Sequence, residues 1–387
     1  MVIGLGLCGG RVADEFNRLN HRAKRKRGTE ITSGVFAVNT SASDLVGLSS
    51  IKADYKHRML IGVDTTQGQG VAGISESAAQ ITQEESDKIT ETIREVKHFY
   101  ETDAIFLIAG TAGGTGSGAL PVLAQRCKQR FPDKQVYAIL VLPFEHEEKE
   151  GERTIYNTAV CLKSTSSVAD AIFLFDNQRY FSEDPALEDD FVQINQSITE
   201  PFYNLLCAGE EKRRKHIGSK LIDAGDIIQT LSGWTVIGYG KMDLPLIKIP
   251  AFTRDFLKTS SETNRGIRAM DEAIGEVSRI CNPNDAAKAL YLISAPTKEL
   301  NVDLIKELGD YLKNVAPNAI IRSGDYPTER GAIEVTVILS QLNDVEKVRE
   351  SYLKSGTATR QKRTKSKSVT STADLPEKDP KRLSDLI

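Results

Sequence analysis

Short apolar runs alternate with segments of helical periodicity over the first half of the chain. Residues 34–38, 104–109, 135–142 and 171–175 are nearly continuous apolar stretches of strand length. Such runs are typical of strands that are buried on both faces of a parallel sheet. Residues 11–19, 82–100 and 119–131 instead carry apolar residues at helical spacing. This alternation predicts an α/β fold built on a parallel sheet.

The second half of the chain has a different pattern. An apolar stripe over residues 185–207 predicts one long helix, and helices are expected again at 270–280 and 302–315. Strands are expected at 289–295, 319–323 and 333–339, which predicts a smaller α+β domain with an antiparallel or mixed sheet. We therefore divide the chain into residues 1–184, a connecting helix at 185–209, a C-terminal domain at 210–350 and a disordered tail at 351–387.

Composition excludes several classes of protein. The 387 residues include 50 basic and 53 acidic side chains, a balance that does not favour nucleic-acid binding. The five cysteines lie far apart without a CxxC pair, which favours a reducing cytoplasm and neither disulfides nor zinc. No apolar run approaches the length of a membrane-spanning helix. We expect a cytoplasmic protein.

The stretch Gly110-Thr-Ala-Gly-Gly-Thr-Gly-Ser-Gly118 separates the apolar run 104–109 from the expected helix 119–131, with Pro121 in its first turn. Without β-carbons, backbone N–H groups can approach phosphate oxygens, and the helix N-terminus adds partial positive charge. Thr111, Thr115 and Ser117 offer hydroxyl donors. No lysine follows, so this is not a P-loop, and backbone dipoles and a metal ion are expected to balance the charge. The alternative is a merely flexible connection.

A second glycine pattern opens the chain. Gly4, Gly6 and Gly9 fit the GxGxxG fingerprint of dinucleotide-binding folds. A nicotinamide-dependent oxidoreductase would place an acid after the second strand, where this chain has Asn39 and Thr40. It would also need a catalytic His or Lys in the second domain, and none is evident. This reading remains a weaker alternative.

The segment from Ala112 to Gly118 matches the signature loop of the tubulin/FtsZ family at every position. The chain resembles that family over residues 2–339, and the stretch Ile321-Arg-Ser-Gly-Asp-Tyr-Pro327 resembles its archaeal CetZ group. The resemblance implies a Rossmann-like GTPase domain, a long central helix and a smaller α+β domain. It also implies a cytoskeletal GTPase that binds GTP or GDP with Mg²⁺ and polymerises head-to-tail into filaments.

The resemblance further implies the residues of the nucleotide site. Glu150 would bind the ribose, and Asn177 and Asn195 would read guanine, since an amide offers both a donor and an acceptor. The other residues implied are those of the glycine-rich segments and their surroundings: Gly9, Gly10, Arg11, Asn39, Gly73, Gly110, Gly113, Gly114, Thr115, Gly116 and Ser117. Singly, each asparagine is equally typical of a turn or a cap.

Two acids form a separate candidate site. Asp223 and Asp226 lie three residues apart and would share one face of a first helical turn, where they could also serve as N-cap and first-turn acid. The resemblance implies that they reach the nucleotide of the next subunit as catalytic groups. Leu221 stands where the family has asparagine, so a polymer with little hydrolysis is one alternative to an active GTPase.

The cellular role and the partners are less defined by the sequence. The CetZ resemblance implies control of cell shape, and an FtsZ-type division ring is the alternative. The basic run at residues 21–27 is expected to be a solvated helix end, or else a surface for an acidic neighbour or lipid headgroups. The tail could bind a membrane-associated or regulatory protein. The principal partner implied is another copy of the chain.

Overall fold

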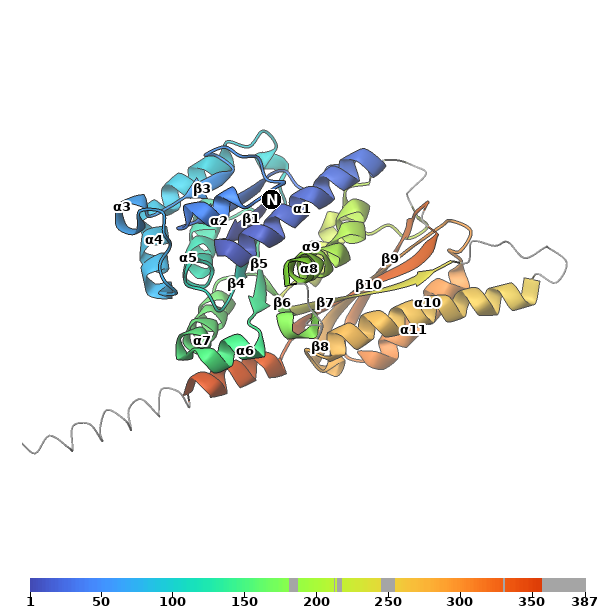
Figure 1. Ribbon diagram of the computed structural model, residues 1–387. Coiled ribbons are helices and arrows are strands. Elements are labelled where there is room, and N and C mark those ends of the chain that lie inside the picture. The colour runs from blue at the N-terminus through green and yellow to red at the C-terminus, as the bar shows by residue number, and fades with distance from the viewer. Residues whose placement is uncertain (181–186, 212, 214–217, 245–254, 330, 357–387) are drawn as a thin grey trace, which may run out of the picture.

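The computed structural model describes residues 1–180, 187–211, 213, 218–244, 255–329 and 331–356 (Figure 1). Within these residues, the strands form a sheet with the order β3-β2-β1-β4-β5-β6-β7-β10-β8-β9. Its strands are β1 (Val2–Leu5), β2 (Val35–Asn39), β3 (Arg58–Leu60), β4 (Ala104–Gly110), β5 (Gln135–Leu142), β6 (Ala171–Asp176), β7 (Gly233–Asp243), β8 (Ala286–Ala295), β9 (Ile320–Pro327) and β10 (Ala332–Leu342).

The first six strands of the chain are parallel, as their apolar runs predicted. Helices α4 (Ser75–Arg94), α5 (Gly114–Arg130) and α7 (Glu152–Ser166) pack on one face, and α1 (Gly6–Arg27) and α8 (Leu187–Gly209) pack on the other (Figure 1). Each face has its own apolar core. The register aligns the carboxyl ends of β1, β4 and β5 at one edge, which we call the glycine edge.

The C-terminal half continues the same sheet. Strand β7 pairs with β6 in parallel, and β10 lies antiparallel between β7 and β8. Helices α10 (Asp255–Ser278) and α11 (Val302–Val315) cover this mixed part of the sheet. The expected α+β domain is therefore confirmed, but its sheet is joined to the parallel one through β6 and β7. The mixed sheet was expected from the sequence, whereas its pairing with the parallel strands through β6 and β7 was not.

Helix α8 connects the two halves, and its apolar stripe faces the core. Phe202 lies 5.5 Å from the ring of Phe16 on α1 and 5.1 Å from that of Phe173 on β6, measured between ring centroids. The same helix also contacts β7, β8 and β10. The expected start of this helix at residue 185 lies outside the described residues.

Several expected boundaries are wrong. Helix α4 begins at Ser75 instead of residue 82, and α5 begins at Gly114, so Pro121 lies inside the helix and not in its first turn. The acidic stretch after β5 is helical, forming α6 (Glu145–Glu150) and the start of α7. Residues 346–356 also form a helix, below α6 and α7 in Figure 1, so the expectation of a disordered tail is wrong for residues 351–356. The rest of that expected tail lies outside the described residues.

Candidate functional site

The glycine-rich segments meet at the glycine edge. Helix α1 follows β1 directly and α5 follows β4 after a short turn, so the N-termini of both helices lie at the same edge. A β-carbon at Gly9 would collide with the carbonyl oxygen of Ile108, and one at Gly116 would lie 2.9 Å from the carbonyl oxygen of Leu5. These glycines therefore let two helix N-termini, with their unpaired N–H groups, crowd over the strand ends.

The expected glycine loop divides into two parts with different roles. Gly113 at its start has no atom within 4 Å of the position of a β-carbon, and neither does Gly73 on the facing loop. Gly114 lies between them, where a β-carbon would be 2.7 Å from the carbonyl carbon of Gly73. At the other end, a β-carbon at Gly118 would collide with the carbonyl oxygen of Ser75, so this glycine lets α5 pack on α4. The open space is thus confined to the start of α5.

The hydroxyl groups of this segment are already engaged. The Oγ1 atoms of Thr115 and Thr40 lie 2.7 Å apart, which ties α5 to the end of β2. Ser117 donates to the carbonyl oxygen of Gly113 one turn earlier in the same helix. Thr111 is fully buried, and its hydroxyl lies 3.2 Å from the carbonyl oxygen of Val141. The expectation that Thr111 offers a hydroxyl to a ligand is therefore wrong.

Two residues of α7 organise the glycine edge, and neither is among the site residues expected from the sequence. Asn157 is buried and its Nδ2 donates to the carbonyl oxygens of Gly73, at 3.0 Å, and Ala112, at 2.9 Å. Arg153, one helical turn earlier, donates to the same Gly73 oxygen at 3.3 Å and pairs with Glu76. Asn157 thus joins the two facing loops. A lone buried polar residue in a helix has no sequence pattern that would reveal this role.

Four more of the expected site residues lie at the glycine edge: Gly10, Arg11, Asn39 and Gly110. Asn39 is buried; its Oδ1 accepts from the N–H of Ser41 at 3.1 Å, and its Nδ2 donates to Asp44 at 3.0 Å, so it shapes the turn into α2 (Ala42–Val46). Gly10 is buried against Leu48, Gly110 lies against Cys8, and Arg11 is exposed.

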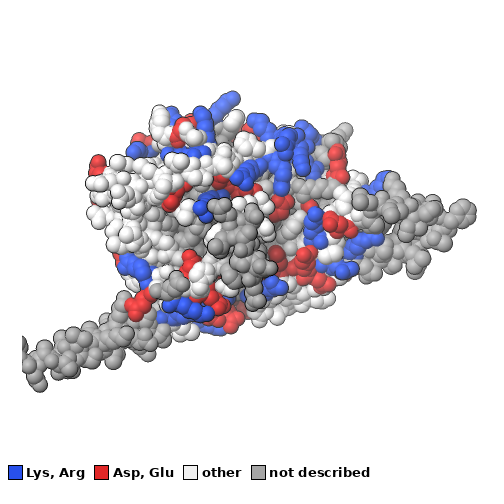
Figure 2. Space-filling model, viewed as in Figure 1, with Lys and Arg blue, Asp and Glu red and all other residues white. Residues whose placement is uncertain are grey.

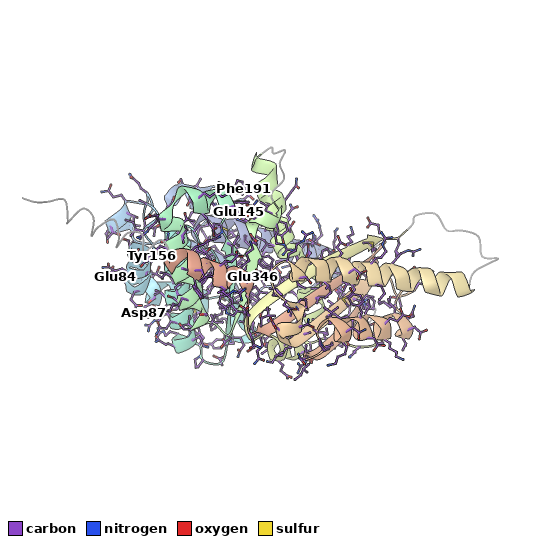
Figure 3. The ribbon with its side chains drawn as sticks, turned by 90° about the horizontal axis from the view of Figure 1, so that it is seen from below. Glu84, Asp87, Glu145, Tyr156, Phe191 and Glu346 are labelled. Carbon is purple, nitrogen blue, oxygen red and sulfur yellow. The ribbon has the colours of Figure 1, made fainter. Side chains whose placement is uncertain are left out.

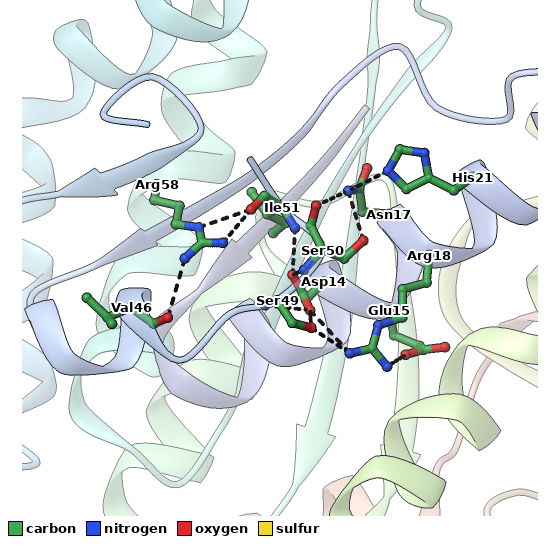
Figure 4. A network of polar contacts seen from close by, with 10 residues as sticks. All are labelled: Asp14, Glu15, Asn17, Arg18, His21, Val46, Ser49, Ser50, Ile51 and Arg58. Carbon is green, nitrogen blue, oxygen red and sulfur yellow. Dashed lines mark hydrogen bonds and ion pairs between the residues drawn. The ribbon is translucent and has the colours of Figure 1, made fainter. Parts of the chain in front are cut away.

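The segment that carries Leu48 is held by a carboxylate on α1. Asp14 accepts hydrogen bonds from the backbone N–H groups of Ser49, Ser50 and Ile51 at 3.1, 2.7 and 2.7 Å (Figure 4). Arg58 holds the same segment from β3 by donating to the carbonyl oxygen of Ile51. Because Leu48 lies against Gly10, this network fixes the first turns of α1 at the glycine edge.

The residues expected to read a base lie at the next strand end. Asn177 begins the turn η2 (Asn177–Tyr180) after β6, and its buried Oδ1 has no hydrogen-bond partner within the described part of the chain. Asn195 is half-buried on α8, one turn after Phe191, whose ring centroid is 6.2 Å from that of Phe144. Figure 3 shows Phe191 beside Glu145, at the start of α6. The side chain of Glu150 lies outside the described residues.

The helix at residues 346–356 forms ion pairs with the end of β6 and with α6. Asp176, which precedes Asn177, accepts from the N–H of Gln178 at 3.0 Å and forms an ion pair with Lys347 at 3.2 Å. Burial lowers the pKa of Lys347, but the neighbouring carboxylates, Asp176 first among them, together raise that pKa above its ordinary value. Lys354 forms a second ion pair with Glu148 on α6, at 2.6 Å. Both pairs join the C-terminal helix to elements beside the expected base site.

Asp223 and Asp226 lie elsewhere. Asp223 is the N-cap of α9 (Ala224–Thr230), where its Oδ1 accepts from the N–H of Asp226 at 2.9 Å. The Asp226 carboxylate is about two-fifths exposed and lies 3.4 Å from the Nε atom of Arg322 on β9. The N-cap interpretation of Asp223 is confirmed. The cap uses only the backbone N–H of Asp226, whose carboxylate remains partly exposed.

Helix α9 lies at the opposite end of the sheet from the glycine edge. It lines a cavity of about 550 Å³. The first residues of β1 and β4 and the last residues of α1 and α8 also line this cavity. Among the lining residues are Met1, Gly28, Ala104, Gly209, Ala224, Ile227 and Ile228. Helix α1 runs from the glycine edge to this cavity over 22 residues, which corresponds to about 33 Å. The acids and the glycine loops of one molecule are therefore not brought together.

Among the described residues, no group of three or more His, Cys, Asp or Glu side chains could hold a metal ion. None of the helices in the ranges that the structure covers is long and apolar enough to span a membrane. Lys and Arg side chains gather over the far end of α1 (Figure 2), where Arg22 pairs with Glu200 at 2.7 Å and Lys24 pairs with Glu30.

Comparison with known proteins gives consistent results for both halves of the chain. Residues 1–183 match the GTPase domain of the tubulin/FtsZ family, and residues 184–355 match the C-terminal domain of tubulin-like CetZ. The chain is 29% identical to the tubulin-like protein CetZ1 of Haloferax volcanii over 90% of this chain and 89% of that protein. It is 27% identical to CetZ of Pyrococcus abyssi, with 91% and 88% covered.

Solved structures agree with this assignment. A GDP-bound monomer of Haloferax volcanii CetZ1 superposes with a TM-score of 0.77 at 26% identity, over 92% of this chain and 98% of that one. A GTPγS-bound protofilament of CetZ2 from the same organism gives the same TM-score at 24% identity, over 94% and 98% of the two chains, and shows the same fold.

Proposed function

The chain belongs to the tubulin/FtsZ family, in its CetZ group, and from this premise we propose that it hydrolyses GTP in sites shared between stacked subunits. GTP binds at the glycine edge of one subunit, and α9 of the next subunit completes the site. Assembly and hydrolysis are then coupled, because an isolated subunit holds only one half of the catalytic residues.

The observation that carries this proposal is the separation of the two halves. The first turns of α1 and α5 lie at one end of the sheet, whereas Asp223 and Asp226 lie at the other, beside the end of α1. No internal rotation of side chains covers about 30 Å. In a head-to-tail stack, the α9 end of each subunit lies on the glycine edge of its neighbour. CetZ2 of Haloferax volcanii, which has the same fold, forms a GTPγS-bound protofilament.

The choice of GTP rests on the corner formed by β6 and α8. A CetZ1 relative binds GDP, and the partnerless Oδ1 of Asn177 has the acceptor character that a guanine donor requires. Asn195 would supply a second amide, and Glu150 would accept from the ribose hydroxyls. The described residues offer no cage of acids for Mg²⁺, so we propose that the ion is held mainly by the nucleotide phosphates and water.

Each part of the chain has a separate task in this reaction. Backbone N–H groups at the starts of α1 and α5 bind the phosphates and are oriented toward the charge of the transition state. The carboxylate of Asp226 orients the attacking water from the neighbouring subunit, and Asp223 fixes the helix turn that carries it. Because phosphoryl transfer to water needs little covalent participation from the protein, positioning and electrostatics account for most of the catalysis.

The cellular role that we propose is cytoplasmic and cytoskeletal. Control of cell shape is carried over with the CetZ-type sequence of the C-terminal domain, and an FtsZ-type division ring is the second candidate. Depletion of the protein in its own host separates the two roles: altered cell outline with normal septa supports the first, and long undivided cells support the second. The proposed tail partner involves residues outside the described ranges.

The shared site predicts how turnover depends on protein concentration. Phosphate release per subunit should be negligible below the assembly threshold, which sedimentation with GTP determines, and should rise steeply above it. A matched Asp226→Asn protein should bind GTP and sediment normally while releasing no phosphate above background. Phosphate release strictly proportional to protein concentration through the threshold would contradict the proposal. Sedimentation without release in the unmutated chain would favour a polymer with little hydrolysis.

A further inference from the structure

In the stretch Ile321-Arg-Ser-Gly-Asp-Tyr-Pro327, the residue described so far is Arg322, through its contact with Asp226. This stretch forms most of β9, which is the edge strand of the sheet next to β8. An edge strand has unpaired backbone groups on its outer side. Here the segment of residues 218–222, which leads into α9, packs against β9, and the residues of β9 contact it at several successive positions.

Asp325 is the main anchor in this contact. Its buried carboxylate accepts from the N–H of Ser219 at 2.8 Å, from the hydroxyl of Ser219 at 3.1 Å and from the N–H of Lys220 at 2.5 Å. The N–H of Asp325 donates to the carbonyl oxygen of Lys220 at 3.0 Å. Hydrogen bonds to an ionised acceptor are stronger than neutral ones, so residues 219–220 are held firmly on the strand.

The neighbouring positions of β9 complete the fit. Ser323 accepts a hydrogen bond from the Nζ atom of Lys220 at 2.6 Å. A β-carbon at Gly324 would lie 2.9 Å from the carbonyl oxygen of Lys220 and would collide with the side chain of Ile222. Glycine at this position therefore allows Ile222, which is 1% exposed, to pack directly on the strand. Any larger residue would push the start of α9 outward.

Tyr326 makes a further contact near the end of α8. Its hydroxyl donates to Glu211 at 3.0 Å, and Glu211 also accepts from the N–H of Arg213 at 2.8 Å. The guanidinium of Arg27, at the end of α1, lies over the Tyr326 ring at 5.2 Å. Tyr326 is almost fully buried. Strand β9 therefore contacts Glu211, just after α8, as well as residues 219–222 before α9.

Arg322 reaches the acid itself. Its Nε atom lies 3.4 Å from Oδ1 of Asp226, and its terminal nitrogen donates to Oε1 of Gln229 at 2.6 Å. The second contact fixes the guanidinium on α9, so the first sets the direction of the Asp226 carboxylate. In the part of the chain that the structure describes, Oδ2 of Asp226 has no hydrogen bond or ion pair. The Asp226 side chain is about two-fifths exposed, so a group from outside the subunit can approach it.

We propose that β9 is a positioning element for hydrolysis, in which Asp325 fixes the approach to α9 and Arg322 aims the Asp226 carboxylate at the neighbouring subunit. This inference rests on the proposed function, because it assigns a role to residues behind the shared site. Neither residue touches GTP. Because a misplacement of about 1 Å can cost about 10²-fold in rate, a loosened segment should lower turnover without affecting nucleotide binding.

The test compares three variants by kcat per assembled subunit, by the Kd for GTP and by amide hydrogen exchange. Asp325→Ala should lower kcat by about 10²-fold and accelerate exchange at Ser219 and Lys220. Arg322→Gln should lower kcat by about tenfold with normal exchange there, and Arg322→Lys should restore only part of the loss, because it keeps the charge without the planar guanidinium. In all three variants, the Kd for GTP should remain that of the unmutated chain.

Lys288→Ala is the matched control. Lys288 on β8 donates to the carbonyl oxygen of Gln229 at 2.9 Å, so the control removes a contact to α9 without touching either acid, and its kcat should be unchanged. Unaltered kcat in Arg322→Gln, or in a folded Asp325→Ala protein with accelerated exchange, overturns the inference. If Asp226→Asn is inactive while all β9 variants turn over normally, only this inference fails. If Asp226→Asn turns over normally, the proposed function fails with it.

Discussion

The two ends of the sheet bind polar groups in opposite ways. At the glycine edge, Gly73 and Gly113 face open space, and the Oδ1 atom of Asn177 has no partner among the described residues. At the α9 end, the capping oxygen of Asp223 and one oxygen of Asp226 are engaged within the subunit. The glycine edge therefore has open space and the Asn177 acceptor for a ligand, whereas the acids at the α9 end are held in place by contacts within the subunit. This difference is what a site divided between two subunits requires.

The largest effect is expected from filling the open space at the glycine edge. Gly113 has an ordinary extended backbone (φ −73°, ψ 170°) and room for a side chain, so Gly113→Val should fold normally. Its side chain would occupy the space assigned to phosphate, and GTP binding should weaken by more than about 100-fold, as loss of several charge-assisted hydrogen bonds predicts. Calorimetry measures the binding, and thermal unfolding checks the fold.

The control for that substitution is Gly275→Ala on α10, another open glycine position. It should leave GTP binding unchanged and raise stability by about 0.5–1 kcal/mol, because alanine favours the helix. If Gly113→Val binds GTP with normal affinity, the phosphates of GTP do not bind at the glycine edge.

The second effect concerns the choice of base. Loss of one buried hydrogen bond costs about 1–3 kcal/mol, so Asn195→Ala should weaken GTP binding roughly 5- to 150-fold. The unmutated chain should prefer GTP to ATP, because the phosphate contacts accept either nucleotide whereas the amides distinguish the purine edges. Titration of both nucleotides with Mg²⁺ present tests the prediction, and equal affinities would leave Asn177 and Asn195 without the proposed role.

A smaller effect is expected behind the base site. Lys347 pairs with Asp176, which is 8% exposed and directly precedes Asn177. Lys347→Ala should lower the affinity for GTP about fivefold, consistent with about 1 kcal/mol for a partly exposed pair. Lys354→Ala, which removes the more distant pair with Glu148, should change the affinity by less than about twofold. If the two substitutions lower the affinity for GTP equally, loss of the Lys347–Asp176 pair does not act on the base site through Asp176.

The smallest effect is expected from removing only the residues after 356. The polar contacts described at both ends of the sheet involve residues before 357, including the pair formed by Lys354. A chain that ends at residue 356 should therefore bind GTP with the Kd of the full chain, whereas one that ends at residue 344 loses Lys347 and should bind more weakly than Lys347→Ala. A large loss on ending the chain at residue 356 would assign the C-terminal residues to the nucleotide site.

Sequence patterns were most informative where burial is complete. The apolar runs that became β5 and β6 have no polar alternation, and burial on both faces explains that directly. The cap at Asp223 was also predictable, because it depends on a local bond within four residues. These features depend on neighbours in sequence, and a single chain contains that information.

Other features depend on contacts between distant segments and could not be predicted. Glycines at the start of α5 gave the pattern of a loop, whereas they form a helix whose close packing excludes β-carbons. Asn157 carries no periodic signal, yet it bonds loops that lie 84 and 45 residues away in sequence. The pairing of β6 with β7 and the contact of β9 with the approach to α9 likewise join segments that no local pattern relates.

The central claim is that Asp226 of one subunit acts on GTP bound to another. The direct test mixes Asp226→Asn protein loaded with GTP labelled on its γ-phosphate with unmutated protein loaded with a non-hydrolysable analogue. Excess free analogue prevents released label from rebinding. The account predicts that labelled phosphate appears only in the mixture, because unmutated subunits supply the acid to the variant's GTP. Filaments that contain both chains but retain the label as GTP would contradict it.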